Sequence, residues 1–301
     1  MAATLLVAAG CAAGGSVANI TQPSEDAADA QTRAGGSPEH AYGLRPPADP
    51  DSLVAPGAHF SAWAALDRDT GEITATSNSA TSYNTTESMI KPWFVADYLR
   101  QLTEQNVQPS QADLDEITLV LVDSNDPLGH KYWAVGGEDF SVRRLVQVCG
   151  LTDVGIEPGL WGWTRMTSLD AVRYGACLAD GRAAGPQWTN WLLDTMRNVR
   201  GGVNDQLSGE VQGGRWGIVD GLAPEVAKQV SLKNGWTEYM DGWHVNCLAI
   251  HPDWIIAVML RTYEGLDSAA AGCAHIASSL IVDTRPEPLL PSPSPLPVTP
   301  A

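Results

Sequence analysis

The chain has 301 residues, of which 44% are hydrophobic, so it is long and apolar enough to bury a sizeable core in one or two domains. Its formal net charge of -17 disfavours nucleic acid and anionic lipid surfaces as partners, because like charges repel. The composition therefore disfavours a nucleic-acid-binding class and favours a well-solvated acidic surface.

The first ten residues are small and apolar, and they end at Cys11. Such a segment is too short to span a bilayer and is typical of the end of an export signal. Ala8-Ala9-Gly10-Cys11 resembles a bacterial lipobox, although no Lys or Arg precedes it, and the alternative is a chance Ala-rich opening. We expect residues 1–11 to be a signal remnant and the mature protein to be secreted, or a lipoprotein held at the cell membrane through Cys11.

Two segments are too poor in apolar periodicity to fold. Residues 12–50 are rich in Ala, Gly, Ser, Pro and acidic side chains, which predicts a disordered tether. Residues 285–301 are dense in proline, which predicts an extended, disordered tail. Residues 51–284 remain as one folded block without an internal repeat.

The folded block alternates between strand and helix patterns. Strands are predicted at 59–66, 72–76, 229–233, 242–251 and 254–261, and helices at 88–105, 141–149, 168–179, 186–198 and 266–281. Ser141 and Ser168 are predicted helix N-caps. This order predicts an α+β fold, with an antiparallel five-stranded sheet flanked by helices and a mainly helical second lobe.

Four cysteines lie in the folded block, namely Cys149, Cys177, Cys247 and Cys273. They allow three disulfide pairings, of which neighbour pairing, 149 with 177 and 247 with 273, is the simplest. The alternative is four buried free thiols. Disulfides would agree with an oxidising, extracytoplasmic compartment. No Cys or His spacing indicates a metal site, and no cofactor motif is present.

Ser88 and Lys91 form an S-x-x-K pattern at the start of a predicted helix. The spacing predicts that both side chains lie on one face, within hydrogen-bond reach. A lysine with a lowered pKa can take the proton of a serine and so make it a nucleophile. The alternative is an N-capping serine with a solvated lysine, which the apolar residues around the pair disfavour.

Two further segments carry polar side chains. Lys233-Asn234-Gly235 ends a predicted strand, and its glycine would let a substrate lie along the strand edge beside the lysine charge. Asp123-Ser124-Asn125-Asp126 lies in the helical region between the other two segments. No histidine pairs with an Asp at a recognisable spacing, so we do not expect a Ser-His-Asp triad.

In this order the three segments resemble the motifs of the penicillin-recognising serine hydrolases, the superfamily of class A β-lactamases and penicillin-binding proteins. That superfamily carries S-x-x-K, S-D-N and K-T-G on one cleft. The resemblance spans residues 50–283. Within the superfamily the chain looks most similar to actinobacterial β-lactamase-like serine hydrolases, in residues 88–100, 162–181, 233–236 and 242–246.

The resemblance implies roles for the matching residues. Ser88 would be the nucleophile and Lys91 its base, and the backbone N–H groups of Ser88 and Thr237 would form the oxyanion hole. Lys233 would hold the carboxylate of a substrate. The residues that would complete this substrate-binding strand are Asn234, which replaces a hydroxyl residue, Gly235, Trp236 and Thr237.

The second motif has two possible alignments. Aligning on Asn125 makes it the catalytic asparagine and places Asp123 where the superfamily has its proton-shuttling serine. Aligning on Ser124 keeps the serine and places Asp126 at the asparagine. We favour the alignment on Asn125, because the spacing to residues 135–137 then matches.

Glu157 opens a Glu-Pro-Gly-Leu segment that resembles the Glu-Pro-x-Leu-Asn loop of class A enzymes, with Trp161 in place of the asparagine. By that resemblance Glu157 would be the base that activates the deacylating water, and the alternative is an ordinary loop carboxylate. Trp161, Trp163, Trp236 and Trp243 either line a binding cleft or belong to the core.

Two functions therefore compete. The first is a monomeric serine hydrolase that forms an acyl-enzyme with a β-lactam or a related amide or ester, without metal or cofactor. The second is a non-catalytic or slowly acylated penicillin-binding protein of the cell envelope, associated with peptidoglycan.

Overall fold

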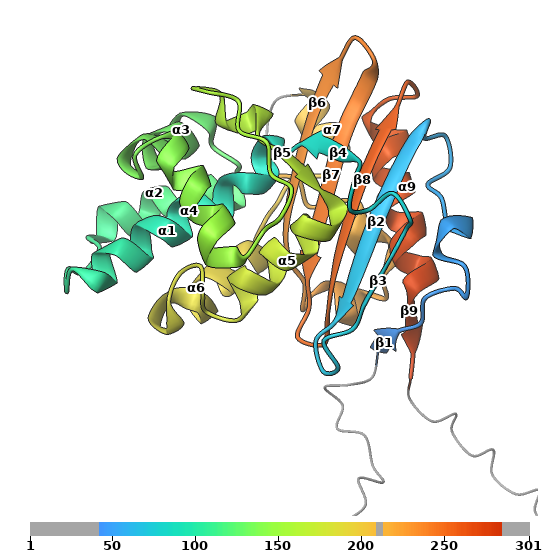
Figure 1. Ribbon diagram of the computed structural model, residues 1–301, viewed down its shortest axis with the longest axis horizontal. Coiled ribbons are helices and arrows are strands. Elements are labelled where there is room, and N and C mark those ends of the chain that lie inside the picture. The colour runs from blue at the N-terminus through green and yellow to red at the C-terminus, as the bar shows by residue number, and fades with distance from the viewer. Residues whose placement is uncertain (1–41, 209–212, 285–301) are drawn as a thin grey trace, which may run out of the picture. The chain divides into compact units, whose positions relative to one another are not determined.

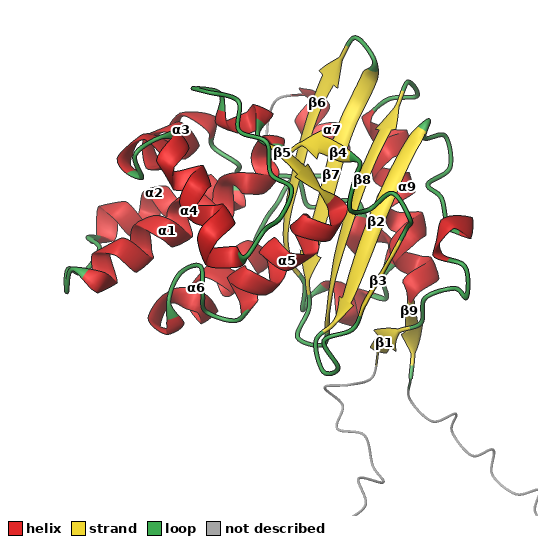
Figure 2. Ribbon diagram, in the orientation of Figure 1, coloured by secondary structure: helices red, strands yellow, loops and turns green. Residues whose placement is uncertain are grey.

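The frame of the protein is an antiparallel sheet with helices on both faces and a helical lobe beside it (Figure 1; Figure 2). The structure is a computed structural model that describes residues 42–208 and 213–284. The expected signal remnant with Cys11, most of the expected tether and the proline-rich tail lie outside the described residues.

The main sheet has five antiparallel strands in the order β3-β2-β8-β7-β6. In that order the strands are β3 (Ile73–Ala75), β2 (Phe60–Asp67), β8 (Trp254–Thr262), β7 (Gly242–Ile250) and β6 (Ser231–Tyr239). β6 therefore forms one edge of the sheet. The α+β class with a five-stranded antiparallel sheet is confirmed.

Helices cover both faces of the sheet and build the lobe beside it (Figure 2). α5 (Ser168–Ala179) packs on one face and α9 (Leu266–Leu280) on the other. The lobe contains α1 (Lys91–Glu104), α2 (Gln111–Val122), α3 (Asp126–Val135), α4 (Asp139–Cys149) and α6 (Pro186–Arg197). Shorter elements are α7 (Val203–Ser208), α8 (Pro224–Ala227), the strand pair β4 (Tyr83–Thr85) and β5 (Arg165–Thr167), and the pair β1 (Tyr42–Leu44) and β9 (Ile281–Asp283).

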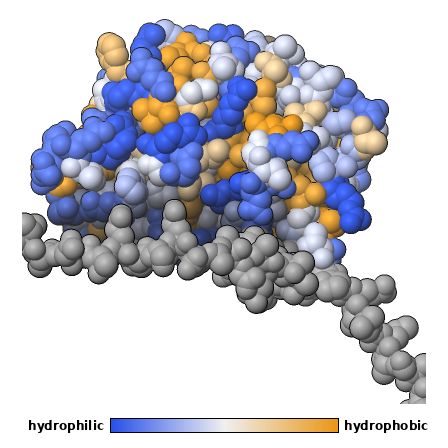
Figure 3. All heavy atoms as spheres, turned by 60° about the horizontal axis from the view of Figure 1, so that its bottom comes forward, coloured by the Kyte–Doolittle hydropathy of each residue, from blue (hydrophilic) through white to orange (hydrophobic). Residues whose placement is uncertain are grey.

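The apolar run of β8 follows from its position between two cores. Ile255, Ala257 and Met259 belong to the core on the side of the helical lobe, whereas Ile256 and Val258 belong to the core under α9. Successive side chains of a strand point to opposite faces. Because this central strand is covered on both faces, it is apolar from Trp254 to Leu260 and polar only at its end. The surface in Figure 3, by contrast, mixes hydrophilic residues with smaller apolar patches.

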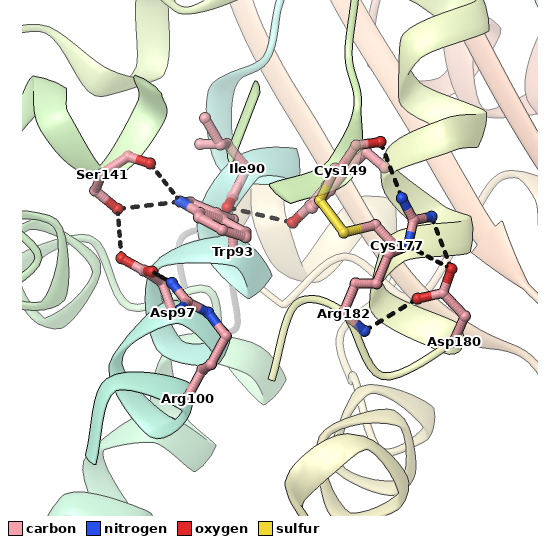
Figure 4. Close-up of a disulfide and its surroundings, with 10 residues drawn as sticks. Ile90, Trp93, Asp97, Arg100, Ser141, Cys149, Cys177, Asp180 and Arg182 are labelled. Atoms are coloured by element: carbon pink, nitrogen blue, oxygen red, sulfur yellow. Dashed lines mark hydrogen bonds and ion pairs between the residues drawn. A yellow bond between two sulfur atoms is a disulfide. The ribbon is translucent and has the colours of Figure 1, made fainter. Parts of the chain in front are cut away.

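A buried polar cluster fixes α1 in the lobe (Figure 4). Asp97 is fully buried, and it pairs with Arg100 at 2.5 Å and with Arg144. The hydroxyl of Ser141 donates to Asp97 at 3.2 Å, and the indole N–H of Trp93 donates to the backbone oxygen of Ser141 at 2.9 Å. These partners compensate the buried carboxylate, which would otherwise be costly.

The disulfides are Cys149–Cys177 and Cys247–Cys273, which confirms the expected neighbour pairing. The first joins α4 to α5, and the guanidinium of Arg182 caps it by donating to the Cys149 carbonyl at 3.2 Å (Figure 4). The second joins β7 to α9. Each disulfide thus fastens a covering helix to its neighbour. Within the described residues, no helix has the length and apolarity needed to cross a membrane.

Four expectations about elements were wrong. Ser141 does not cap α4, which begins at Asp139, because its hydroxyl is used in the buried cluster with Asp97. Ser168 does not cap α5 but is its first residue, because the N-cap is Thr167, whose hydroxyl oxygen accepts the Asp170 N–H at 3.1 Å. The fold begins before residue 51, since β1 pairs with β9. β6 does not end at Lys233 but continues to Tyr239, because its backbone stays paired with β7 along that whole length.

Candidate active site

Ser88 lies in a single 3₁₀ turn, Glu87–Ile90, that leads directly into α1. Met89 and Ile90 are fully buried and anchor the turn, whereas Ser88 remains partly exposed. Ser88 lines a cleft of about 580 Å³ whose walls come from this turn, the start of α3, residues 159–163 and β6. The predicted nucleophile is therefore accessible, at the junction of the sheet and the helical lobe.

Lys91 is fully buried under this cleft. Its ammonium donates to the backbone oxygen of Ser124, to Ser124 Oγ at 3.1 Å and to Asp126 Oδ1 at 2.5 Å. These three acceptors match the three donors of a protonated lysine. No hydrogen bond in the described part of the chain joins Lys91 to Ser88, so the expected direct contact is not formed. Gly129 of α3 permits this burial, since a Cβ there would lie 3.0 Å from Lys91 Cε.

The contacts of Ser124 and Asp126 overturn the favoured alignment on Asn125. Ser124 is buried, and its left-handed backbone, with φ of 54°, turns its hydroxyl toward Lys91. Asn125 caps α3, because its side-chain oxygen accepts the Leu128 N–H at 2.9 Å. These contacts favour the other alignment, in which Ser124 would take the serine position of the motif and Asp126 the position of the asparagine.

Asp123 lies apart from this group. Its carboxylate forms two hydrogen bonds to the Arg200 guanidinium, at 2.6 and 2.7 Å. It therefore does not occupy the position of a proton-shuttling serine. Residues 123–126 are all polar, and the sequence does not show which of them face Lys91. The left-handed backbone at Ser124 settles this in the structure.

Lys233 also lies beneath the cleft rather than in its wall. It is fully buried, and its ammonium donates to the Gly213 carbonyl at 3.4 Å. Burial and the nearby Lys91 charge hold the pKa of Lys233 well below its ordinary value. Burial likewise lowers the pKa of Lys91, while the charge and hydrogen bond of Asp126 act in the opposite direction.

Asn234 and Gly235 both have structural roles in β6, of different kinds. Asn234 is buried and donates its amide to the carbonyls of Gly214 at 2.8 Å and Trp216 at 2.9 Å, so it holds the segment beside β6. Gly235 lies against the turn of the nucleophile, where a Cβ would be 3.0 Å from the backbone nitrogen of Ser88. The close approach of β6 to Ser88 therefore depends on glycine at that position.

Trp236 and Thr237 both line the cleft with Ser88. They lie on the edge strand β6, where alternate backbone N–H groups point away from β7. A second cavity of about 180 Å³ is lined by Ser88, Ser124, Asp126, Gln206 and Trp236. Gln206, on the short α7, also lines this second cavity, and no motif in the sequence pointed to it.

Glu157 does not line the cleft, and its side chain is exposed. The residues that follow it do enter the wall, including Trp161 and Trp163. Trp243 is not among the lining residues and packs against the core under α9. Of the four tryptophans considered from the sequence, three thus face the cleft.

Glu87 was missed from the sequence, where its position next to Ser88 was the only signal. It lines the cleft in a left-handed backbone conformation, with φ of 47°. One carboxylate oxygen accepts the Tyr239 hydroxyl at 2.7 Å. The other lies 3.0 Å from the Thr237 hydroxyl, which shares its proton between Glu87 and the Trp236 carbonyl at 2.7 Å.

Two histidines lie beside an aspartate, which the sequence spacing had not indicated. His244 Nε2 lies 3.0 Å from Asp241 Oδ1, and His251 Nδ1 lies 3.6 Å from Asp253 Oδ2. None of these four residues lines the cleft of Ser88, so neither pair completes a Ser-His-Asp triad there. Among the described residues, no group of His, Cys, Asp and Glu side chains is arranged to hold a metal ion.

No protein-family model and no curated protein matches this sequence. Solved structures do match. They include a mutant of the class A β-lactamase of the last common ancestor of Gram-negative bacteria, with 13% identity, 76% of this chain and 94% of that chain covered, and a TM-score of 0.57. A β-lactamase from Xanthomonas campestris pv. campestris has 13% identity over 74% of this chain and 91% of its own, with a TM-score of 0.56.

A class A β-lactamase from Mycobacterium abscessus matches with 14% identity over 75% of this chain and 95% of that chain, with a TM-score of 0.55. The fold is that of the class A β-lactamases. At this identity the similarity establishes the fold alone and leaves the reaction to be argued from the site.

Proposed function

We propose that the protein is a serine hydrolase that acts through an acyl-enzyme on a β-lactam or a related amide or ester. The observation that carries this proposal is the hydrogen-bonded group of Lys91 and Ser124 beneath an accessible Ser88. Burial lowers the pKa of Lys91, so a neutral amine is available to accept a proton at a lower pH than in water.

In the proposed acylation, Ser88 Oγ forms a bond to the carbonyl carbon of the substrate and its proton passes to neutral Lys91. The bond from this carbon to the leaving nitrogen or oxygen then breaks. The leaving group takes a proton from Ser124, whose hydroxyl is replenished from Lys91. Backbone N–H groups at Ser88 and Thr237 would stabilise the intermediate oxyanion.

In deacylation, water attacks the ester carbon, the carbonyl–Oγ bond breaks, and Ser88 recovers a proton as the acid is released. Glu157 is exposed and outside the cleft wall. A general base typically contributes about 10²–10⁴-fold to such a step. We therefore expect deacylation to be slow and the acyl-enzyme to persist.

The test is intact-protein mass spectrometry after incubation with a fluorescent penicillin and, separately, with a serine-reactive phosphonate. We expect an adduct on the wild type and none on Ser88→Ala. The absence of an adduct with both reagents, or an equal adduct on the variant, would contradict the proposal. We expect this adduct to be lost slowly, whereas an adduct that never hydrolyses would favour a penicillin-binding protein over a hydrolase.

We further propose that the protein works outside the cytoplasm as a monomer, with a membrane contact only through a lipid on Cys11. The two disulfides support the compartment, because such bonds persist in oxidising environments. Metabolic labelling with a fatty-acid probe in a bacterial host, with Cys11→Ser as the control, tests the anchor.

A further inference from the structure

Glu87 is held beside the nucleophile by an arrangement that orients its carboxylate without neutralising it. Its two oxygens accept hydroxyl groups from Tyr239 and Thr237, both on β6. Hydroxyl donors are neutral, and no Lys or Arg in the described residues forms an ion pair with Glu87. The left-handed backbone at Glu87 is uncommon outside glycine and persists where the surroundings enforce it.

The described part of the cleft wall carries two acidic side chains and no lysine or arginine. The acidic residues are Glu87 and Asp126, and the one further ionisable side chain among the described lining residues is the imidazole of His130. Lys91 compensates Asp126 from below, and Lys233 is fully buried. The charge of Glu87 therefore remains to be balanced by whatever enters the cleft.

Aromatic side chains flank the same carboxylate. Trp163 is 49% exposed, and its ring meets the ring of Tyr239 edge-on at 6.3 Å. Gly162 lies so close to Glu87 that an added Cβ would be 3.4 Å from Oε2. Trp236 lines the cleft from β6. Aromatic faces next to a carboxylate form the surroundings that proteins use to bind ammonium groups.

We propose that this cleft selects acyl donors that carry an ammonium group near the scissile carbonyl, and that it disfavours donors with a carboxylate there. The inference rests on the proposed function, since Ser88 is the group that the donor acylates. An ammonium group balances Glu87, whereas a carboxylate is repelled by Glu87 and cannot reach the buried amine of Lys233.

Because of the position of Glu87, the ammonium group of the substrate is expected to affect the rate of acylation as well as binding. The Thr237 hydroxyl, bonded to Glu87, belongs to the residue whose N–H is proposed for the oxyanion hole. A fixed negative charge beside a developing oxyanion opposes it unless a cation lies between them. The ammonium group of the substrate therefore acts in the transition state as well as in binding, so it affects the acylation rate constant.

The test uses three para-nitrophenyl esters of matched length: trimethylammoniobutyrate, its neutral tert-butyl isostere, and the glutarate monoester. The second-order acylation rate constant is measured for the wild type, Glu87→Gln and Glu238→Gln. Glu238 is exposed on the same strand and does not line the cleft, so it controls for the loss of one charge.

We expect the wild type and Glu238→Gln to prefer the cationic over the neutral ester by about tenfold, the effect of one partly desolvated charge pair. Glu87→Gln should lose that preference and gain rate with the anionic ester. Equal ratios in the wild type and Glu87→Gln, or a wild-type preference for the anionic ester, would overturn the inference while the proposed function stands.

Two further measurements distinguish a failure of the inference from a failure of the proposed function. If Glu87→Gln does not fold, the wild-type preference is followed against ionic strength, where a charge-based preference must decline as salt screens it. A wild-type ratio near one, or a ratio independent of salt, overturns the inference. If no ester gives an adduct that Ser88→Ala abolishes, the proposed function and the inference both fail.

Discussion

At the scale of single residues, Asp126 distinguishes this site from the motif it resembles. A carboxylate stands where the superfamily pattern has an asparagine, and it pairs with the buried ammonium of Lys91 at 2.5 Å. Because an opposite charge favours the protonated form, the pair works against the effect of burial on the Lys91 pKa. The fraction of neutral base is therefore set by two opposing effects.

We expect Asp126→Asn to move the pH dependence of acylation to lower pH. Acylation needs neutral Lys91, so the rising limb of the profile follows the apparent pKa of the base, which is shared with the nearby Lys233. Removing Asp126 removes the two effects that raise the pKa of Lys91. The measurement is the acylation rate constant of a neutral ester against pH.

Asp123→Asn is the matched control, because it removes the same charge from an ion pair with Arg200 outside the cleft. Its profile should coincide with that of the wild type. A rise in the midpoint for Asp126→Asn, or the same shift in both variants, contradicts the role given to the pair.

At the scale of elements, the nucleophile is positioned by α1 and β6 together. The turn that carries Ser88 continues into α1, and Gly235 of β6 lies against its backbone. α1 is in turn held by the buried cluster around Asp97, which ties it to Ser141 of α4 (Figure 4). The Cys149–Cys177 disulfide then fastens α4 to α5 on the sheet.

We expect the double variant Cys149→Ser/Cys177→Ser to lose about 2–4 kcal/mol of unfolding free energy, because the unfolded chain is no longer constrained by the bridge. Urea unfolding with and without a reductant measures the loss. A reductant should destabilise the wild type more than the variant, since the variant keeps only the Cys247–Cys273 bridge. A loss below about 1 kcal/mol in the absence of reductant would contradict the expected contribution of the bridge.

At the scale of the whole molecule, the fold supports two buried amines at a cost in stability. Lys91 and Lys233 are fully buried, and burial lowers the pKa of each. A lysine with a lowered folded pKa binds its proton more weakly in the folded chain than in the unfolded chain. Stability therefore rises with pH between the folded pKa and the ordinary value of 10.5.

We expect Lys233→Met to increase the unfolding free energy at neutral pH by about 1–4 kcal/mol, because a chain of similar volume replaces a buried amine. The gain should shrink as pH rises toward 10.5, where the unfolded lysine also loses its proton. Denaturant unfolding at neutral and alkaline pH measures both effects. Lys228→Met, at an exposed lysine, should change neither, and a pH-independent gain would refute the explanation.

Much of the fold was predictable from the sequence. The strands around Phe60–Asp67 and Trp254–Thr262 and the helices Ser168–Ala179 and Leu266–Leu280 have local apolar patterns that match their final burial. The neighbour disulfides followed from simple pairing. The extension of β6 beyond Lys233 was not predictable, because its pairing partner β7 lies later in the chain.

The sequence by itself determined the α+β class and the candidate nucleophile, because these depend on local periodicity and spacing. It left three disulfide pairings open, and the structure shows the simplest of them. Only the tertiary structure decided which polar side chains meet Lys91. The left-handed turn at Ser124 directs Ser124 and Asp126 to the lysine and leaves Asp123 to Arg200. The packing of β6 against the Ser88 turn likewise brings Glu87 to Thr237 and Tyr239. These residues are far apart in the sequence, so no local sequence pattern could predict the contact.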